Sequence, residues 1–157
     1  MKKHKWRLYL DTSVFGGCFD TAQGWAEDSR RVVEAAREGI VKICFSATVA
    51  RELEGAPKPV RELRDSLPPA CYEQVPVTPE IRGLSAAYVA AGIIGRTSLD
   101  DALHVAAATV SRVDAIVSWN FKHIVRLDRI KGYNQVNLSL GYGILTIVSP
   151  KEVQFDE

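Results

Sequence analysis

Short, mostly apolar runs alternate along this chain with longer stretches of helical periodicity. The apolar runs cover residues 6–10, 40–45, 113–119 and 144–148, and residues 72–77 form a shorter extended piece among prolines. Runs that are apolar at consecutive positions are typical of parallel strands that are covered on both faces. The pattern predicts a central, mainly parallel sheet of four to five strands.

Helical patterns occupy the segments between these runs. They cover residues 25–38, 47–54, 60–66, 80–91, 99–111 and 123–130. Ser46 is a favourable N-cap for the second of these helices, and Gly39 is suited to end the first. Strands that alternate with helices predict an α/β fold in which helices cover both faces of the sheet.

Length and composition narrow the class of protein. The chain has 157 residues, of which 46% are hydrophobic and 25% charged, as in globular proteins, and this length fits one domain over residues 1–157. The basic start at Met1–Trp6 lacks the apolar segment of a signal peptide, and no apolar run approaches membrane-spanning length. We therefore expect a cytoplasmic protein with no membrane partner.

Charge, cysteines and histidines exclude several kinds of site. A formal net charge of +1 provides no global attraction to nucleic acid. Binding of a polyanion would need a local patch, for which Arg126, Arg129 and Lys131 are candidates, although a solvated helix face explains them equally well. The three cysteines and three histidines lack the spacing of zinc or redox motifs, so neither chemistry is expected.

Polar residues follow two of the predicted strands. Asp11 comes directly after the first strand, and Asn120 directly after the strand that ends at Trp119. In an open parallel sheet, sites form at the carboxyl ends of the strands. Asp101 lies in the first turn of the helix before the second of these strands, and it reaches the same edge if helix and strand are antiparallel.

One more carboxylate comes from the helix at 47–54, where periodicity does not choose between Glu52 and Glu54. Clustered carboxylates raise one another's pKa unless a cation lies among them. Oxygen ligands at a hydrated sheet edge suit Mg²⁺ or Mn²⁺. A cation held in this way activates water and neutralises charge on a phosphate, which is the chemistry of metal-dependent nucleases.

Each position also has an ordinary structural explanation. Asp11 and Asn120 are common turn residues, and Glu52 fits a solvated helix surface. The sequence Ser98-x-x-Asp101 fits a helix capping box. Taken singly, each of these explanations is preferred; the coincidence of four such residues at one edge favours a functional site.

Four runs of the sequence resemble PIN-domain ribonucleases of the VapC toxin-like kind. They are Tyr9–Phe15, Phe45-Ser46 followed by Arg51–Leu53, Asp101–Ala106, and Val113–Ile124. The last two runs, in this order and spacing, are the most specific. A related subgroup shares the Trp-Asn-Phe-Lys-His sequence that follows Ser118.

The resemblance implies a three-layer α/β/α PIN-like fold, with an acidic pocket that binds Mg²⁺ or Mn²⁺ for hydrolysis of RNA. It selects Glu52 over Glu54 and Asp101 over Asp100. The implied catalytic and metal-binding set is Asp11, Glu52, Asp101 and Asn120. The resemblance also implies an RNA substrate, an antitoxin partner as in a type II toxin–antitoxin pair, and a homodimer.

Asn120 departs from the family's pattern, in which many members carry a fourth aspartate. An amide keeps an oxygen ligand but removes one negative charge, which weakens a second metal site more than the first. Ser13 and Ser118 are candidates to hydrogen-bond the carboxylates, although a turn or strand-end hydroxyl is the simpler role for each. His104, on the polar arc of its helix, and His123 are expected at the surface or beside the site rather than among the ligands.

Two other functions stay open at this point. One is a haloacid-dehalogenase-type phosphatase that uses Asp11 as its nucleophile. Such an enzyme needs a second acid two residues after the nucleophile, and this chain has Ser13 there. A PIN-like module whose activity has lapsed at Asn120 would hold RNA or a protein without turnover. Retention of three acids favours the enzyme.

Overall fold

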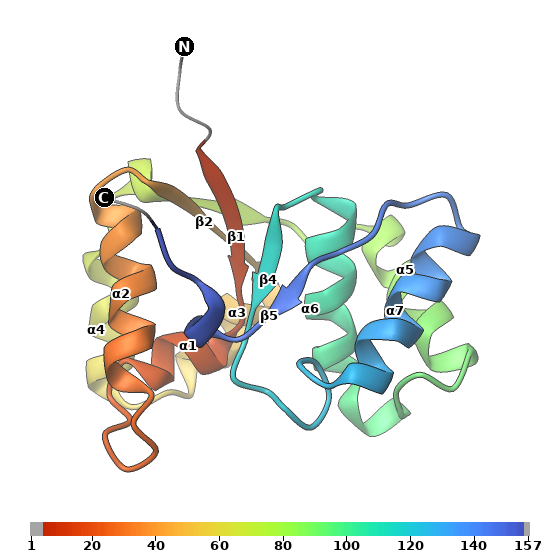
Figure 1. Cartoon of the computed structure of the whole chain (residues 1–157), viewed down its shortest axis with the longest axis horizontal. Helices are drawn as coiled ribbons and strands as arrows, with labels where there is room; N and C mark the ends of the chain where they lie inside the picture. The colour runs from red at the N-terminus through yellow and green to blue at the C-terminus, as the bar shows by residue number, and fades with distance from the viewer. Residues whose placement is uncertain (1–4, 156–157) are drawn as a thin grey trace.

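A parallel sheet of five strands forms the centre of the computed structural model, which describes residues 5–155 (Figure 1). The strands are β1 (Trp6–Leu10), β2 (Val41–Ser46), β3 (Tyr72–Val75), β4 (Ala115–Val117) and β5 (Ile147–Val148). Their order is β3-β2-β1-β4-β5, and every neighbouring pair is parallel. The predicted parallel sheet is confirmed.

Helices cover both faces of this sheet. They are α1 (Thr12–Gly17), α2 (Ala26–Arg37), α3 (Ala47–Glu54), α4 (Lys58–Ser66), α5 (Pro79–Ala90), α6 (Leu99–Val110) and α7 (Leu127–Ser139), with 3₁₀ turns at Pro69–Cys71, Arg96–Ser98 and Pro150–Glu152. In Figure 1, α2 lies on one side of the sheet, whereas α5, α6 and α7 lie on the other. This is the predicted three-layer α/β/α arrangement.

The central strand β1 is apolar because both of its faces are covered. Leu8, Tyr9 and Leu10 are all buried, as expected for an inner parallel strand. Leu10 pairs with Val117 of β4, so the residues that follow, Asp11 and Ser118, are neighbours at the carboxyl edge of the sheet. The first turn of α6 begins at this same edge in Figure 1, as the antiparallel helix–strand arrangement requires.

Helix α1 was not predicted from the sequence. Thr12–Gly17 contains two glycines and two β-branched residues, which have low helix propensity. Val14 and Phe15 are nevertheless fully buried. Tertiary burial of one apolar face therefore stabilises a short helix that its local sequence does not favour.

The helix predicted at 123–130 is wrong at both ends. α7 begins at Leu127, because the backbone N–H groups of Ile124 and Val125 donate to the carbonyl of Asn120, at 3.1 and 2.8 Å, and hold the preceding segment in a turn. It continues to Ser139 through Gly132, where an added Cβ would lie 2.7 Å from Ile93 Cδ1. The absence of a side chain at Gly132 thus permits close packing of this helix against Ile93.

Smaller differences concern strand ends and side chains. The apolar runs at 113–119 and 144–148 form strands only at Ala115–Val117 and Ile147–Val148. All three cysteines are buried free thiols. The part of the basic start at residues 1–4 lies outside the described residues.

Across residues 5–155, none of the helices combines the length and apolarity needed to cross a membrane.

Candidate active site

Asp11 lies at the carboxyl end of β1 and is only 4% exposed. Ser13 Oγ donates to its Oδ1 over 2.5 Å, and Ser118 Oγ donates to its Oδ2 over 2.7 Å. Burial raises the pKa of Asp11; His104 and the two serines lower it without cancelling the rise, and the nearby Asp101 adds to it. Asp11 is therefore a fixed, desolvated carboxyl group and not a solvated turn residue.

The two serines connect Asp11 with the segment after β4. Ser13 Oγ accepts a hydrogen bond from the backbone N–H of Trp119, and Ser118 Oγ accepts one from the N–H of Asn120, both at 2.9 Å. Each hydroxyl thus donates to the carboxylate while it accepts from the backbone. Both serines combine the two roles that the sequence left open, and together they fix the orientation of Asp11.

Glu52 reaches from α3 toward α1 and α6. Its Oε1 accepts hydrogen bonds from Thr12 Oγ1 at 2.9 Å and from His104 Nε2 at 2.6 Å. Burial acts to raise the pKa of Glu52, but the hydrogen bond and charge of His104, together with Thr12, outweigh it and lower the pKa. Glu52 is therefore an ionised carboxylate that ties three helices together.

His104 connects the acids, and its ring is 2% exposed. Tyr9 OH donates to Ser46 Oγ over 2.7 Å, so His104 Nδ1, 2.8 Å from the same hydroxyl, must be the donor there. Its Nε2 donates to Glu52, so both ring nitrogens carry a proton. Burial opposes this charge, but Glu52, Asp11 and Asp101 raise the pKa of His104 overall. An imidazolium is thus built into the acid cluster.

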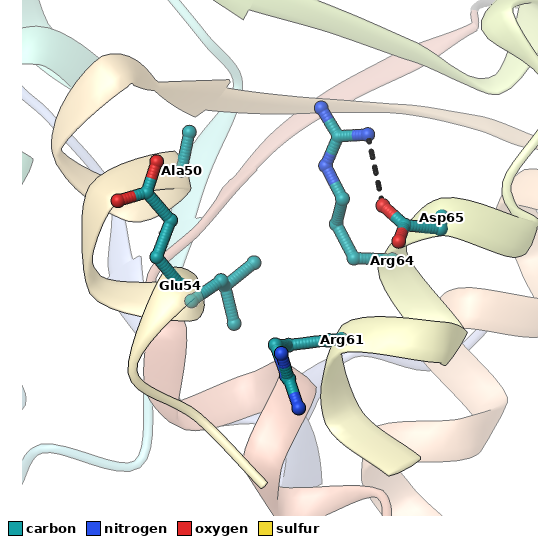
Figure 2. Close-up of a pocket in the computed structure, with 6 residues that line it drawn as sticks. Ala50, Glu54, Arg61, Arg64 and Asp65 are labelled. Carbon is teal, nitrogen blue, oxygen red and sulfur yellow. Dashed lines mark ion pairs between the residues drawn. The ribbon is translucent and has the colours of Figure 1, made fainter. Parts of the chain in front are cut away.

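Glu54, which the sequence pattern could not separate from Glu52, faces a different part of the surface. It lines a pocket between α3 and α4 together with Arg61, Arg64 and Asp65 (Figure 2). Arg64 and Asp65 form an ion pair at 3.7 Å across one end of this pocket. Of the two glutamates, Glu52 is therefore the one that joins the other acids.

Asp101 and Asn120 form the remaining part of the cluster. The side chain of Asn120 favours the ionised form of Asp101 and so lowers its pKa, and Asn120 Oδ1 accepts the backbone N–H of His123 at 2.9 Å. Burial raises the pKa of Asp101; His104, His123 and Asn120 lower it only in part, and Glu52 adds to the rise. The neighbouring Asp100 instead forms an exposed ion pair with Arg51 at 2.7 Å.

The structure brings the four predicted site residues together at the carboxyl edge of the sheet. Charge coupling links Asp11 with Asp101, Asp101 with Glu52, and His104 with all three acids. Within residues 5–155, no three side chains of His, Cys, Asp or Glu are arranged as a preformed ligand set for a metal ion. In this arrangement the acids interact through His104 and through their hydroxyl and amide donors.

The roles of His104 and Tyr9 were not predicted from the sequence. His104 was expected on the polar arc of its helix, but its ring is buried because Glu52 and Tyr9 satisfy both of its nitrogens. The spacing of these two residues from the acids could have indicated that they belong to the site. His104 follows Asp101 by three residues and so shares a face of α6, and Tyr9 precedes Asp11 by two and so shares a face of β1.

Two other interpretations of residues near the site change: the capping box at Ser98 is not formed, and two residues of the candidate basic patch have partners. Ser98 makes no capping bond to α6, and its Oγ lies 3.3 Å from His123 Nε2 instead. Arg126 pairs with Asp128 at 2.8 Å, and Arg129 donates to the carbonyl of Ile93. The candidate basic patch is therefore weakened, because two of its cations are engaged within the protein.

Comparison with known proteins supports the fold. No protein-family model matches the sequence, and no curated protein has a significant match to it. Among solved structures, the chain is similar to one in the crystal structure of VapBC2 from Rickettsia felis bound to a DNA fragment from their promoter, with a TM-score of 0.56 and 14% sequence identity. The similarity covers 91% of this chain and 98% of that one. At this identity it shows a PIN-like fold, which is independent of any particular activity.

Proposed function

We propose that this chain is a metal-dependent endoribonuclease, with Asp11, Glu52, Asp101 and Asn120 as its catalytic and metal-binding residues. The observation that supports it is the meeting of three carboxylates and an amide, from four separate segments, around one buried histidine at a sheet edge. The raised pKa values of Asp11 and Asp101 mark a site that gains from added positive charge. Clusters of buried acids are typical of functional sites and rare elsewhere in protein interiors, because burying several like charges is costly.

The chemistry of the donor set fits Mg²⁺ or Mn²⁺. Every candidate ligand is a carboxylate or amide oxygen, which these ions prefer. Asp11 is oriented by two hydroxyl donors, as metal ligands in proteins are commonly oriented by hydrogen bonds from residues around the site. Both hydrogen bonds to Glu52 are made to Oε1, so Oε2 is the atom that would face a cation. Asn120 Oδ1 accepts one bond, from the backbone N–H of His123, and its second lone pair would be the one to offer a cation.

When bound, the cation would polarise the attacking water and neutralise charge on the scissile phosphate. The chain's own residues would have separate tasks. Asp11 is held by its serines as a fixed carboxylate, and Asp101, the acid that interacts with both Asp11 and Glu52, would accept a proton from the water. His104 would hold Glu52 in place and offset part of the negative charge that repels RNA.

A catalytically weak or inactive module that binds RNA or a protein is the second candidate. The imidazolium of His104 already supplies positive charge to the acids. The amide of Asn120, where many PIN-domain relatives carry an aspartate, is engaged with Asp101. Both features reduce the demand for a bound cation and therefore favour binding without turnover.

The proposed setting is that of a type II toxin in the cytoplasm, with an antitoxin protein and a second copy of the chain as partners. The fold similarity to a chain of the VapBC2 complex supports the antitoxin. The sequence resemblance to VapC-like ribonucleases supports the homodimer and the RNA substrate.

Neighbouring aspartates provide the test. Purified wild-type chain and the variants Asp11→Asn, Asp101→Asn and Asp100→Asn are incubated with single-stranded RNA and Mg²⁺ or Mn²⁺. Wild type and Asp100→Asn should cleave, Asp11→Asn and Asp101→Asn should not, and a chelator should stop all cleavage. Metal-independent cleavage that survives both site substitutions would contradict the proposal. A metal-dependent rise in melting temperature without RNA turnover would favour the binding module.

A further inference from the structure

A cluster of three aromatic rings adjoins the acids. Trp25 and Trp119 stack with ring centroids 4.6 Å apart and planes inclined by 2°, and Phe121 meets them edge-on at 6.3 and 6.1 Å. We call these three residues the aromatic cluster. Trp119 and Phe121 flank Asn120 in the sequence, so the cluster lies one residue from the side chain that favours the ionised form of Asp101.

The inner ring, Trp119, is rigidly held. It is 2% exposed, and its Nε1 donates to Ser29 Oγ over 2.7 Å. Its backbone N–H donates to Ser13, the serine that holds Asp11. An added Cβ at Gly17 would lie 2.7 Å from Trp119 Nε1, so the glycine is needed for the indole to lie there. Ser13 therefore holds both Trp119 of the aromatic cluster and the carboxylate of Asp11.

The outer rings are accessible on ordered backbone. Phe121 is 47% exposed and Trp25 is half-buried. A bond from Phe121 N to Trp119 O at 2.9 Å fixes the turn that carries the exposed ring. The connections that carry these rings, between α1 and α2 and between β4 and α7, both lie at the edge where β1 ends (Figure 1). A large apolar ring held exposed beside a polar site points to a ligand with a flat apolar face.

We propose that Trp25 and Phe121 form a stacking platform for an unpaired nucleobase that flanks the scissile phosphate. This inference rests on the proposed ribonuclease function and adds to it a preference for single-stranded substrate. Nucleobases stack on aromatic side chains with little regard to sequence. A base inside a duplex is already stacked on its neighbours, so the platform accepts only a base that is free to leave them.

An RNA base fits this surface better than a protein partner. The accessible part consists of two rings, and it is continuous with the acids through Asn120. Lys122 follows Phe121 directly and is exposed, so a cation accompanies the ring at the place where a phosphate backbone would run. Phe121 and Trp25 are therefore positioning residues, which would orient the substrate without touching the reacting atoms.

Binding of labelled oligoribonucleotides tests the platform separately from cleavage. All variants are made in the Asp101→Asn chain, with Mg²⁺ present, and fluorescence anisotropy is measured with a single-stranded 10-mer and with an abasic oligomer of equal length and charge. Phe121→Ala should weaken binding of the base-bearing oligomer roughly tenfold and leave the abasic oligomer unaffected. Phe121→Tyr, which keeps the ring, should restore binding.

Trp6→Ala is the matched control. Trp6 is also an exposed aromatic residue, at 45%, but it lies at the opposite end of β1 from Asp11. Trp6→Ala should bind the base-bearing oligomer as tightly as the parent. In that chain only Trp25 and Trp119 remain as tryptophans, so RNA should quench their fluorescence and the abasic oligomer should not.

The outcomes separate the two proposals. Loss of base-dependent binding in Phe121→Ala supports the platform even if wild type proves not to cleave RNA, which would contradict only the nuclease. Equal binding by Phe121→Ala and Trp6→Ala, with wild-type cleavage intact, would overturn the platform and leave the nuclease. Absence of any RNA binding, or a chain that dimerises only when Phe121 is present while RNA binding stays unchanged, would also overturn it.

Discussion

His104 Nε2 lies 2.6 Å from Glu52 Oε1, and this contact joins α6 to α3 inside the acid cluster. Arg51 and Asp100, 2.7 Å apart, join the same two helices at the surface. The side chains of the first pair are 2% and 31% exposed, whereas those of the second are 60% and 48% exposed. The two ion pairs have nearly the same length, so burial is the main difference between them.

His104→Ala is expected to destabilise the fold far more than Arg51→Ala. Removal of His104 leaves the partly buried carboxylate of Glu52 without its ion-pair partner and the buried Tyr9 hydroxyl with one hydrogen bond fewer. Together these losses should lower the free energy of unfolding by about 3 kcal/mol. Arg51→Ala breaks an exposed pair and should cost about 0.5 kcal/mol. Urea unfolding of both variants measures the difference. Equal losses of unfolding free energy in the two variants would mean that the buried pair stabilises the fold no more than the exposed pair.

Asn120→Asp should make stability depend on divalent cations. The new carboxylate would replace an amide that favours the ionised form of Asp101 with a like charge, so without metal we expect a loss of about 1–2 kcal/mol. Added Mg²⁺ should then raise the melting temperature of this variant more than that of wild type, because binding stabilises the folded state. Asn120→Ala, which removes the amide without adding charge, is the control. A rise of equal size in wild type and in Asn120→Asp would contradict a metal site at this position.

Adjacent glycines of α1 should respond in opposite directions to alanine. At Gly17 an added Cβ would lie 2.5 Å from Ser29 Oγ and 2.7 Å from Trp119 Nε1, so Gly17→Ala should cost about 1–3 kcal/mol. At Gly16 nothing beyond the adjacent residues and the backbone of its own helix lies within 4 Å of the added Cβ, so Gly16→Ala should be neutral or stabilise by up to about 1 kcal/mol. Denaturant midpoints with unchanged m-values provide the comparison. Similar effects of the two substitutions would show that Trp119 can move aside.

Buried thiols should resist alkylation in the folded chain. Burial raises the pKa of Cys18 to about 11 and that of Cys44 to about 12. Because the thiolate is the reactive form, roughly one Cys18 side chain in a thousand is ionised at pH 8, and reactivity should rise with pH up to about 11. Iodoacetamide at pH 8, followed by mass spectrometry, should modify the urea-unfolded chain much faster than the folded one. Rapid modification of both cysteines under native conditions would contradict their burial.

Several elements were predictable because local chemistry decides them. Ser46 accepts the N–H of Thr48 at 3.2 Å, and the helix it caps has the predicted bounds Ala47–Glu54. The strand Trp6–Leu10 also has its predicted bounds, since a continuous apolar run needs a buried place in a sheet. Helix α1 and the turn at 120–125 were not predictable, because burial of Phe15 and hydrogen bonds to Asn120 decide them.

The candidate site also has parts that the sequence predicted and parts that depend on the tertiary structure. By itself the sequence determined that Asp11 follows a strand and that Asp101 starts a helix, because apolar periodicity places these positions and parallel topology brings them to one edge. It put Asn120 directly after a strand, whereas in the structure that strand ends at Val117 and Asn120 begins the turn that follows. Periodicity left Glu52 and Glu54 equivalent and the family resemblance selected Glu52, but only the tertiary structure decided that Glu52 bonds His104 while Glu54 lines another pocket. It also decided that His104 is buried as a cation between Tyr9 and Glu52, since its partners come from β1 and α3, far from it in the chain. Periodicity describes one element at a time, whereas the charge and hydrogen bonding of a site depend on several elements packed together.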